Sequence, residues 1–541
     1  MLRGLMMDQP LLIASILEHA SENHGDAEIV TRTIEGPIHR YTYAQCHQRA
    51  RQLAQALEQL GIEGGDRVGT LAWNTHRHLE LYYAISGIGA VTHTINPRLF
   101  VEQILYIIAH AEDRVIFFDI NLAPLVERIA AHCPTVTHWV AMTDREHRPA
   151  IPLPNLHCME DLIEAQSGQM TWPTFDEYTA SGLCYTSGTT GNPKGVLYHH
   201  RSTVLHACGA ALPDVFGLSA RDVLLPVVPM FHVNAWGSPY FGPMVGAKLV
   251  MPGAAMDPQS LYELFESEKV TLSAGVPTVW LNLFAWMRQH KRHFSTLKRV
   301  VVGGSACPPA MIREFADTYG VDCQHAWGMT EMSPLGTYGT LKAKHLEQPE
   351  ETHFAVKQKQ GRTLFGVSMK ITDDAGKTLP RDGKAFGDLL VRGPWVTRGY
   401  FKGEGGDILR EGWFPTGDVA TIDHDGYMAI TDRSKDVIKS GGEWISSIDL
   451  ENIAIAHPAV AEAAAIGVAH PKWDERPLLI VVPKPGAAVD RATLLAFFEG
   501  KVAKWWIPDD VVLATELPHT ATGKLLKTAL RNQYGSHAWP T

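Results

Sequence analysis

The sequence predicts a mixed α/β fold: a large N-terminal domain of doubly wound α/β subdomains plus a β-rich subdomain, followed by a small C-terminal α+β domain. Three observations favour this fold class. Strand-like and helix-like segments alternate through the first half of the chain, short strands with turns occupy about residues 363–430, and a smaller unit of both kinds follows. With 541 residues, the chain is also too long for one compact core.

The alternation is clearest between Asp66 and Asp119. The predicted strands span residues 68–73, 91–95 and 115–118, and the predicted helices span residues 78–88 and 101–111. Before them, residues 11–17 indicate an amphipathic first helix, since the apolar run is short and has no cleavage pattern of a signal peptide. Nowhere do about 18 apolar residues run together, so no transmembrane span is predicted.

Later segments continue the pattern. Residues 300–302 form a predicted strand that ends in Gly303 and Gly304, where ligands of α/β sheets bind. A helix is predicted to begin at Pro308–Pro309 and to end at Gly320. Beyond the β-rich part, the pattern predicts strands at 463–469 and 478–482 and a helix over 492–504.

Composition excludes several classes of protein. An apolar content of 45% and a charged content of 20% are typical of a globular protein, and the net charge of −10 disfavours nonspecific binding to nucleic acid. The seven cysteines are scattered without a CxxC pair, which favours a reducing cytoplasm over a disulfide framework or a zinc site. The 26 histidines include close pairs, but no carboxylate or thiol ligands recur at metal-binding spacing.

The stretch Tyr185-Thr-Ser-Gly-Thr-Thr-Gly-Asn-Pro-Lys-Gly195 predicts a loop that binds a nucleoside triphosphate. Its two inner glycines permit positive φ, so backbone N–H groups can converge on an anion, and a lysine adds a mobile charge. The predicted phosphate contacts are Thr186, Ser187, Gly188, Thr189, Thr190, Gly191 and Lys194.

The order of residues in this loop differs from a Walker A motif, because lysine precedes glycine and no hydroxyl follows. An ordinary glycine-rich surface turn is the alternative. The flanks favour the phosphate loop: residues 183–185 resemble a buried strand end, and apolar residues at helical spacing follow from Val204 to Leu212. Strand, glycine-rich loop and helix is therefore the predicted local order.

Four further segments complete a recognisable set. They are Trp327-Gly-Met-Thr-Glu331, Trp413-Phe-Pro-Thr-Gly-Asp418, the stretch 432–443 with Asp432-Arg-Ser-Lys435 and Ser440-Gly-Gly-Glu443, and Pro518-His-Thr-Ala-Thr-Gly-Lys524. With them the chain resembles the adenylate-forming superfamily of acyl-CoA synthetases, luciferases and peptide-synthetase adenylation domains. Residues 229–236 are typical of its fatty acyl-CoA synthetase branch, which includes ligases for 3-methylmercaptopropionate.

The resemblance implies roles in binding ATP and Mg²⁺. Glu331 and Thr186 would hold Mg²⁺, for which oxygen ligands are suited, and Asp418 and Arg433 would bind the ribose. The other implied contacts of the nucleotide are Gly304, Ser305, Ala306, Trp327, Gly328, Met329 and Thr330. Core packing is the alternative for Trp327, and a turn aspartate is the alternative for Asp418.

The resemblance also implies the catalytic, acyl and CoA residues. Lys524 would neutralise developing charge, and His232, Trp236 and Gly303 would lie along the acyl group, with core packing as the alternative for His232 and Trp236. Gly441, Gly442 and Trp444 would face CoA after a rotation about Lys435. The implied domains are residues 1–432, with the β-rich subdomain at about 363–430, a hinge at 433–435, and a mobile C-terminal domain at 436–541.

The expected activity is that of an acid–thiol ligase, an AMP-forming acyl-CoA synthetase using ATP, Mg²⁺ and CoA. The alternatives are a stand-alone acyl-AMP ligase without transfer to CoA and a non-catalytic adenylate-binding protein. Apolar candidates for the acyl pocket, Val228, Trp236, Val302 and Met329, favour an aliphatic or thioether acid, with 3-methylmercaptopropionate as the specific choice. A cytoplasmic location is expected. Because enzymes of this branch often form homodimers, the resemblance also allows a homodimer.

Overall fold

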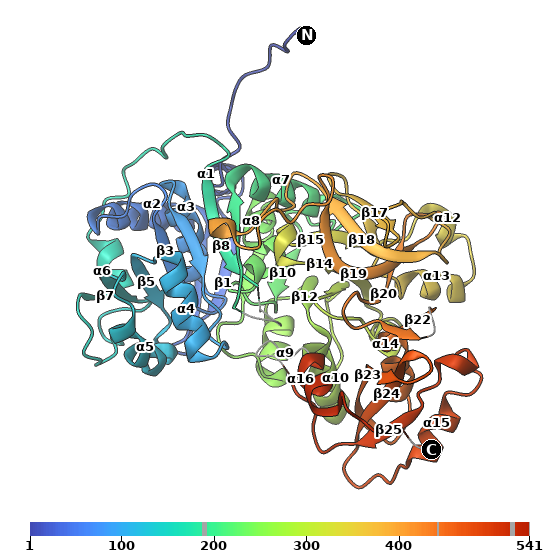
Figure 1. Ribbon diagram of the computed structural model, residues 1–541. Helices are drawn as coiled ribbons and strands as arrows, with labels where there is room; N and C mark the ends of the chain where they lie inside the picture. The colour runs from blue at the N-terminus through green and yellow to red at the C-terminus, as the bar shows by residue number, and fades with distance from the viewer. Residues whose placement is uncertain (187–191, 441–442, 520–524, 540–541) are drawn as a thin grey trace. The chain divides into compact units, whose positions relative to one another are not determined.

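The computed structural model describes residues 1–186, 192–440, 443–519 and 525–539, and the chain divides into two compact units (Figure 1). The described part of the first unit comprises Met1–Thr186, Asn192–Val367 and Gly393–Asp407. That of the second lies within Ser368–Arg392 and Ile408–Thr541. The second unit thus joins the predicted β-rich subdomain to the C-terminal part, and the predicted boundary at 433–435 stays a prediction.

Seven strands of the first unit's described residues form one mainly parallel sheet. Its order is β7-β6-β5-β3-β4-β8-β9, and only the β8–β9 pair is antiparallel. The strands are β3 (Arg67–Leu71), β4 (Val91–Thr94), β5 (Val115–Phe118), β6 (His138–Ala141), β7 (Leu156–Cys158), β8 (Ala180–Tyr185) and β9 (Gly195–His199).

Helices cover both faces of this sheet. Along β5, Val115 and Phe117 pack in one apolar cluster with α2 (Tyr43–Gln59) and α3 (His76–Gly87). Ile116 and Phe118 pack in another cluster with α4 (Val101–Ala111) and α5 (Ala123–Ile129). Because successive side chains of a strand point to opposite faces, this alternation buries both sides of the sheet, as a doubly wound fold requires.

A second sheet in the first unit contains nine strands among the described residues, in the order β16-β15-β14-β13-β12-β10-β11-β1-β2. The inner pairs from β14 to β1 are parallel, and the pairs at both edges are antiparallel. The strands are β1 (Glu28–Arg32), β2 (Ile38–Thr42), β10 (Val223–Pro226), β11 (Lys248–Met251), β12 (Leu272–Gly275), β13 (Arg299–Val302), β14 (Asp322–Gly328), β15 (Leu335–Tyr338) and β16 (Arg362–Thr363).

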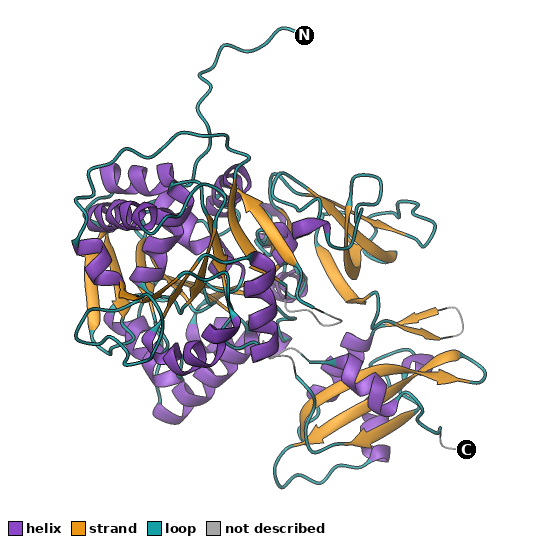
Figure 2. Ribbon diagram, turned by 60° about the vertical axis from the view of Figure 1, so that its left-hand side comes forward, coloured by secondary structure: helices purple, strands orange, loops and turns teal. Residues whose placement is uncertain are grey.

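The remaining helices of the first unit surround these strands, as the purple ribbons of Figure 2 show. They are α1 (Ala14–Asn23), α6 (Met159–Glu164), α7 (His200–Ala211), α8 (Ser238–Met244), α9 (Pro258–Ser267), α10 (Pro277–His290), α11 (Pro309–Arg313), α12 (Ala343–Leu346) and α13 (Glu350–Lys357).

The second unit holds two smaller sheets. In its described residues, an antiparallel sheet has the order β17-β18-β19-β20, and a second sheet has the order β22-β21-β24-β23, with β25 parallel to β24. The elements are β17 (Ser368–Thr372), β18 (Phe386–Arg392), β19 (Phe414–Ile422), β20 (Met428–Arg433), β21 (Ile438–Ser440), β22 (Glu443–Ile445), α14 (Ser447–Ile455), β23 (Val460–His470), β24 (Asp474–Pro483), α15 (Arg491–Phe497), β25 (Asp510–Leu513) and α16 (Lys527–Tyr534).

Two local predictions are wrong. The predicted order of strand, loop and helix omits β9, in which Val196 and Tyr198 are buried and Leu197 is exposed. That period of two is a strand pattern, so the glycine-rich loop joins two strands and α7 begins only at His200. The predicted helix 492–504 ends at Phe497, because Gly500 adopts a positive φ of 75°.

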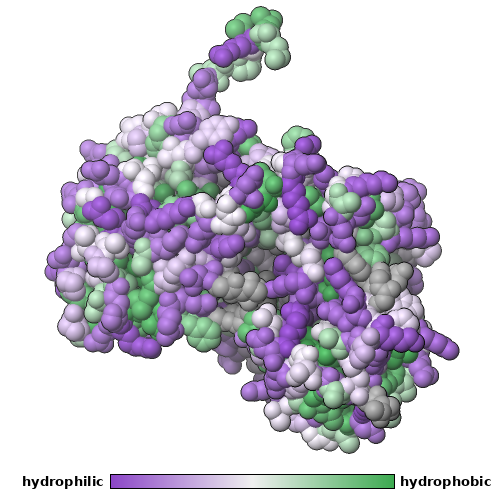
Figure 3. Space-filling view, in the orientation of Figure 1, coloured by the Kyte–Doolittle hydropathy of each residue, from purple (hydrophilic) through white to green (hydrophobic). Residues whose placement is uncertain are grey.

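The surface and the helices both bear on the prediction that no segment spans a membrane. Figure 3 shows hydrophilic residues spread over the visible face, with apolar ones interspersed. In the part of the chain that the structure describes, no helix is both long enough and apolar enough to cross a membrane.

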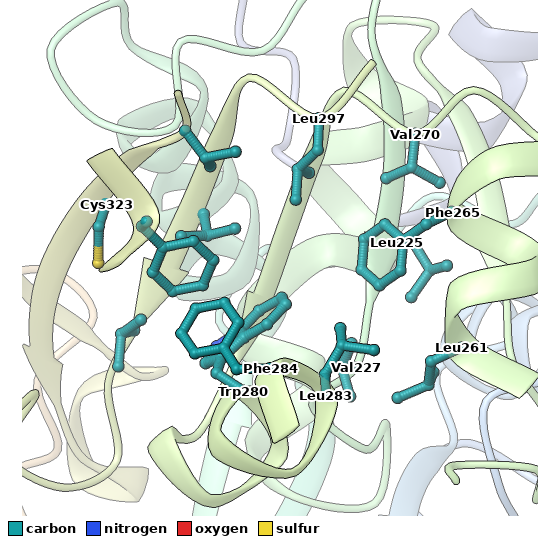
Figure 4. Close-up of a cluster of buried hydrophobic side chains, with 14 of the residues drawn as sticks. Leu225, Val227, Leu261, Phe265, Val270, Trp280, Leu283, Phe284, Leu297 and Cys323 are labelled. Carbon is teal, nitrogen blue, oxygen red and sulfur yellow. The ribbon is translucent and has the colours of Figure 1, made fainter. Parts of the chain in front are cut away.

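The core beneath the nine-stranded sheet is a cluster of aromatic and aliphatic side chains (Figure 4). Trp280, Leu283 and Phe284 of α10 are fully buried there, whereas Leu281 of the same helix is 48% exposed. Helical spacing therefore directs one face of α10 into the cluster and turns Leu281 outward.

We expect Phe284→Ala to destabilise the protein by about 3–5 kcal/mol, because the substitution removes a buried ring and leaves a cavity. Chemical unfolding should show the first transition at lower denaturant concentration. The matched control is Leu281→Ala, which should leave that transition within about 0.5 kcal/mol of the wild type. Equal losses in both variants would contradict the assignment of Phe284 to the core.

Candidate active site

The predicted phosphate loop begins and ends in a β-hairpin. Tyr185 at the end of β8 pairs with Gly195 at the start of β9. Next to this pair, the Thr186 amide donates to the Lys194 carbonyl at 2.9 Å, and the Lys194 amide donates to the Thr186 hydroxyl at 3.2 Å. The predicted contacts between them lie outside the described residues: Ser187, Gly188, Thr189, Thr190 and Gly191.

The segment Trp327–Glu331 spans the end of β14 and is bound to β9. The Tyr198 hydroxyl donates to the Thr330 carbonyl at 2.6 Å. A side chain at Gly328 would overlap the Pro334 carbonyl, so this position requires glycine. Met329 is half-buried and donates its amide to the same carbonyl at 3.0 Å. The chain turns here, so Thr330 and Glu331 lie just beyond the carboxyl end of β14.

Tyr400 contacts two of the predicted ATP residues. Its hydroxyl donates to the Glu331 carboxylate at 2.8 Å, and the Lys194 ammonium lies 4.9 Å from the centre of its ring. Burial and the neighbouring Glu331 carboxylate raise the pKa of Tyr400 far above its ordinary value, so the hydroxyl stays a donor. Lys194 and Glu331 therefore both contact Tyr400.

The donor atoms around Glu331 fit magnesium. The Glu331 side chain is buried and accepts from Tyr400, Thr330 precedes it in the chain, and Thr186 offers a further hydroxyl oxygen at the base of the predicted phosphate loop. Carboxylate and hydroxyl oxygens are hard ligands of the kind that Mg²⁺ prefers when it accompanies phosphates. Glu331 and Thr186 would hold the ion, and its charge would stabilise the polyphosphate.

Gly303, predicted beside the acyl group, and Gly304, predicted beside the nucleotide, lie at the carboxyl end of β13. Gly303 is buried, and a Cβ there would lie 2.9 Å from the Ala326 carbonyl and 3.2 Å from the Trp236 ring. Gly304 has a φ of 78°, a conformation that favours glycine. The three residues after Gly303 are exposed: Gly304, Ser305 and Ala306. Exposed backbone beside glycine is accessible to a planar ligand.

Trp327 and Trp236 are buried, whereas His232 is half-buried. Trp327 is buried and packs over Gly336, where a side chain would meet its ring. Its predicted role beside adenine and its alternative role in packing both stay open. His232 is half-buried, and its amide closes a turn with the Pro229 carbonyl at 3.0 Å. Trp236 lies against the glycine pair, as its distance to Gly303 shows.

Asp418 and Arg433 lie in the second unit, on neighbouring strands. They are register partners of β19 and β20, and the Arg433 Nε lies 3.0 Å from the Asp418 carboxylate. Asp418 is buried and Arg433 is largely exposed. A buried aspartate with a fixed arginine can accept hydrogen bonds from vicinal hydroxyls, which agrees with the predicted ribose role.

Residues on the two sides of the predicted hinge have partly different contacts within the second unit. Ser434 is bound to the four-stranded sheet, where its hydroxyl donates to Asp388 at 2.9 Å. Arg531 of α16 donates to the Lys435 carbonyl at 3.1 Å and pairs with Asp436. Other hydrogen bonds cross the hinge, because the Ser446 hydroxyl and the Ser447 amide donate to Thr431 and Asp432 of β20. Burial lowers the pKa of Lys435.

The predicted CoA and lysine positions are described only in part. Trp444 lies in β22 and pairs in register with Lys439. Gly441, Gly442 and Lys524 lie outside the described residues. Their roles stay predictions.

Sequence reasoning missed Tyr198 and Tyr400. Tyr198 is 132 residues from its partner Thr330, and Tyr400 is 69 residues from Glu331. Residues 196–198 are all apolar, so no alternation in the sequence places Tyr198 on an inward face, and no local pattern identifies either partner.

Comparison with known proteins decides the family. The family model described as AMP-binding enzyme matches residues 17–401, and the model described as AMP-binding enzyme C-terminal domain matches residues 449–524. The chain belongs to the AMP-binding enzyme family. The predicted resemblance to adenylate-forming enzymes is thereby confirmed.

Curated relatives are similar over nearly the whole chain. The 3-methylmercaptopropionyl-CoA ligase of Ruegeria lacuscaerulensis is 54% identical over 531 residues, which cover 98% of this chain and 98% of the relative. The medium-chain-fatty-acid–CoA ligase of Ectopseudomonas oleovorans is 52% identical, with 98% and 97% covered. The long-chain-fatty-acid–CoA ligase of Thermus thermophilus is 46% identical, also with 98% and 97% covered.

A solved structure confirms the fold class. The anthranilate CoA ligase AuaEII in complex with anthranoyl-AMP is 27% identical, with a TM-score of 0.84 and with 97% of this chain and 98% of that chain covered. The fold is that of adenylate-forming enzymes, with a large N-terminal and a smaller C-terminal domain. The predicted class, an AMP-forming acyl-CoA ligase that uses ATP, Mg²⁺ and CoA, is also confirmed.

We expect Tyr400→Phe to lower kcat/KM for MgATP about tenfold, because it removes a hydrogen bond to the Glu331 carboxylate. Exchange of pyrophosphate into ATP at graded Mg²⁺ concentrations, together with direct calorimetry of MgATP binding, measures the effect. The ring beneath Lys194 is retained in this variant.

Tyr400→Leu removes the ring as well and should lose more than Tyr400→Phe. Tyr178→Phe is the control, because Tyr178 is exposed and has Arg201 over its ring, far along the chain from Glu331. Unchanged Mg²⁺ dependence and MgATP affinity in Tyr400→Phe would show that the Glu331 contact has no role in binding.

Proposed function

We propose that this AMP-forming acyl-CoA ligase activates an apolar carboxylate of short or medium length, with 3-methylmercaptopropionate as the specific acid. The observation that carries the proposal is the 54% identity to the 3-methylmercaptopropionyl-CoA ligase over 98% of both chains. The apolar residues near the predicted acyl site support it, since Val228 and Trp236 are buried and Met329 is half-buried. Val302 packs in the core beneath the sheet instead.

The first half-reaction forms a mixed anhydride. A carboxylate oxygen of the acid attacks the α-phosphorus of ATP, the new P–O bond forms, and the bond to pyrophosphate breaks. Lys194 and the loop donors hold the polyphosphate, and Glu331 and Thr186 hold Mg²⁺. Lys524 neutralises the charge that develops on the phosphoryl oxygens. Tyr400 keeps the Glu331 carboxylate in place through its 2.8 Å hydrogen bond.

The second half-reaction transfers the acyl group. The CoA sulfur attacks the acyl carbonyl, the C–S bond forms, the C–O bond to AMP breaks, and the thiol proton is released. The C-terminal domain, residues 436–541, rotates about Lys435 between the two steps and brings Gly441, Gly442 and Trp444 to CoA. This rotation is the one that the resemblance implies.

The nucleotide contacts are those that the resemblance implies. Trp327, Gly328, Met329, Thr330 and the segment 304–306 bind the adenine and the α-phosphate, and Asp418 with Arg433 binds the ribose. His232 and Gly303 lie along the carboxyl end of the acid. A cytoplasmic location and a homodimer complete the proposal, in keeping with the scattered cysteines and with the enzymes of this branch.

We expect Lys524→Ala to lose the first half-reaction by about 10²–10³-fold, the cost of removing one charge-stabilising group. The same variant should still make thioester from preformed acyl-AMP and CoA. Pyrophosphate exchange measures the first step, and a thioester assay with synthetic acyl-AMP measures the second. An equal loss of both steps would refute the assigned division of labour.

A panel of carboxylates of graded length tests the acid. We expect the highest kcat/KM with 3-methylmercaptopropionate or an acid of similar length, because each methylene that a pocket cannot accommodate costs about 1–3 kcal/mol. Release of pyrophosphate and formation of acyl-CoA are measured together. Acyl-AMP without acyl-CoA would favour a stand-alone acyl-AMP ligase, and neither product with any acid would favour a non-catalytic adenylate-binding protein.

A further inference from the structure

A five-residue segment after β10 follows a left-handed path. The φ angles are 38° at Val233, 57° at Asn234, 45° at Ala235, 57° at Trp236 and 90° at Gly237. L-residues other than glycine and asparagine avoid this region because Cβ approaches the carbonyl oxygen, and a β-branched residue avoids it most. Four consecutive non-glycine residues in this conformation therefore form a strained turn that needs support from its surroundings.

Asn234 supplies one point of support. It is a residue type that tolerates the left-handed region, and it is buried with its side-chain oxygen in contact with α3. The Tyr82 hydroxyl lies 3.0 Å from this oxygen and donates to the Met230 carbonyl at 2.6 Å. The Cys184 thiol lies 3.5 Å from the same oxygen. Tyr82 thus binds the chain on both sides of His232.

The approach to the turn is fixed by Asn74. Its amide nitrogen donates to the carbonyls of Pro226 and Val228, at 2.9 Å each, and its oxygen accepts the Met230 amide at 2.6 Å. At the other end of the turn, a side chain on Gly237 would meet the His206 ring at 2.7 Å. Buried groups therefore fix the approach to the strained turn and its middle, and only glycine fits beside His206 at its end.

The side chain that this turn orients is Trp236. A Cβ built on Gly303 would lie 3.2 Å from the Trp236 ring, and one on Gly304 would lie 3.8 Å from it. The indole consequently lies along the glycine pair at the carboxyl end of β13. Its position depends on backbone angles that would relax toward negative φ if the support at Asn234 were lost.

We propose that Tyr82 and Asn234 are positioning residues which hold the left-handed turn, keep Trp236 against Gly303 and Gly304, and so limit the length of acyl chain that the enzyme accepts. The role in chain length rests on the function proposed above. Relaxation of the turn moves the indole from the glycine pair and opens space for additional methylenes. The hydrogen bond from Tyr82 acts on the acid through Trp236 and does not touch the reacting atoms.

The chain offers a matched pair of variants. Tyr82 and Tyr83 are adjacent in α3, both are fully buried, and each donates to a backbone carbonyl at 2.6 Å. The partner of Tyr83 is Pro239, which lies beyond the turn. Tyr82→Phe and Tyr83→Phe therefore remove the same kind of bond, and only the first removes the contact with Asn234.

We expect both variants to lose similar thermal stability, while only Tyr82→Phe changes the choice of acid. In Tyr82→Phe, the ratio of kcat/KM for octanoate to that for butyrate should rise about tenfold. This factor is the lower end of the effect that one methylene has on kcat/KM in a hydrophobic pocket. The change should arise in KM for the acid, and KM for ATP should stay at the wild-type value. Asn234→Gly, which keeps the left-handed backbone accessible, should show the same change of ratio.

A readout without turnover tests the position of the indole directly. The protein is labelled with 5-fluorotryptophan, and Trp236→Phe assigns the ¹⁹F resonance of Trp236 among the 14 tryptophans. We expect this resonance to shift or broaden in Tyr82→Phe and Asn234→Gly and to stay unchanged in Tyr83→Phe.

An unmoved resonance in both Tyr82→Phe and Asn234→Gly would overturn the proposal, as would the same change of acid ratio in Tyr83→Phe. A moved resonance with a wild-type acid profile would overturn the role in chain length. Failure of the proposed function gives a different result: the wild-type enzyme would form no acyl-CoA from any acid of the panel, whatever the ¹⁹F spectra show.

Discussion

The two large sheets of the first unit meet through buried polar side chains, and the rest of that unit depends on this junction. Asn74, Tyr82 and Tyr198 come from the seven-stranded sheet and the segments that follow its strands. They bind backbone groups at the end of β10 and beyond the ends of β10 and β14 in the nine-stranded sheet. A buried donor or acceptor without a partner costs about 1–3 kcal/mol. The sheets can therefore close only in the arrangement that satisfies these groups together, which fixes the segments between them.

The same junction explains where the candidate site lies. His232 follows β10, Gly303 follows β13 and Thr330 follows β14, so all three lie beyond the carboxyl ends of parallel strands in one sheet, with β12 between β10 and β13. Parallel strands align those ends on one edge of the sheet. Asn74, Tyr82 and Tyr198 each bind a backbone carbonyl or amide near the point where β10 or β14 ends. The hydrogen bonds that join the two sheets consequently also fix the segments of the candidate site.

The sequence predicted the elements with strong periodicity and missed the contacts that cross the junction. Residues 101–111 and 115–118 were predicted with the bounds of α4 and β5, because their apolar spacing is unbroken. The partners of Tyr198 and Asn74 lie more than a hundred residues away, and they are backbone groups that carry no signature of their own. The left-handed turn at Val233 opposes local propensity, so only tertiary contacts could reveal it.

The hairpin geometry changes how the phosphate loop can neutralise charge. A loop at a helix N-terminus would use the helix dipole, which is fixed in place. Here β9 follows the loop, so the cation near it is Lys194, which is exposed and held over the Tyr400 ring. An exposed contact of this kind contributes about 0.5–1 kcal/mol. The lysine can therefore leave the ring for a phosphate, whereas Tyr400 keeps its hydrogen bond to the buried Glu331. A fixed carboxylate beside a movable cation suits a reaction in which pyrophosphate departs while the adenylate stays bound.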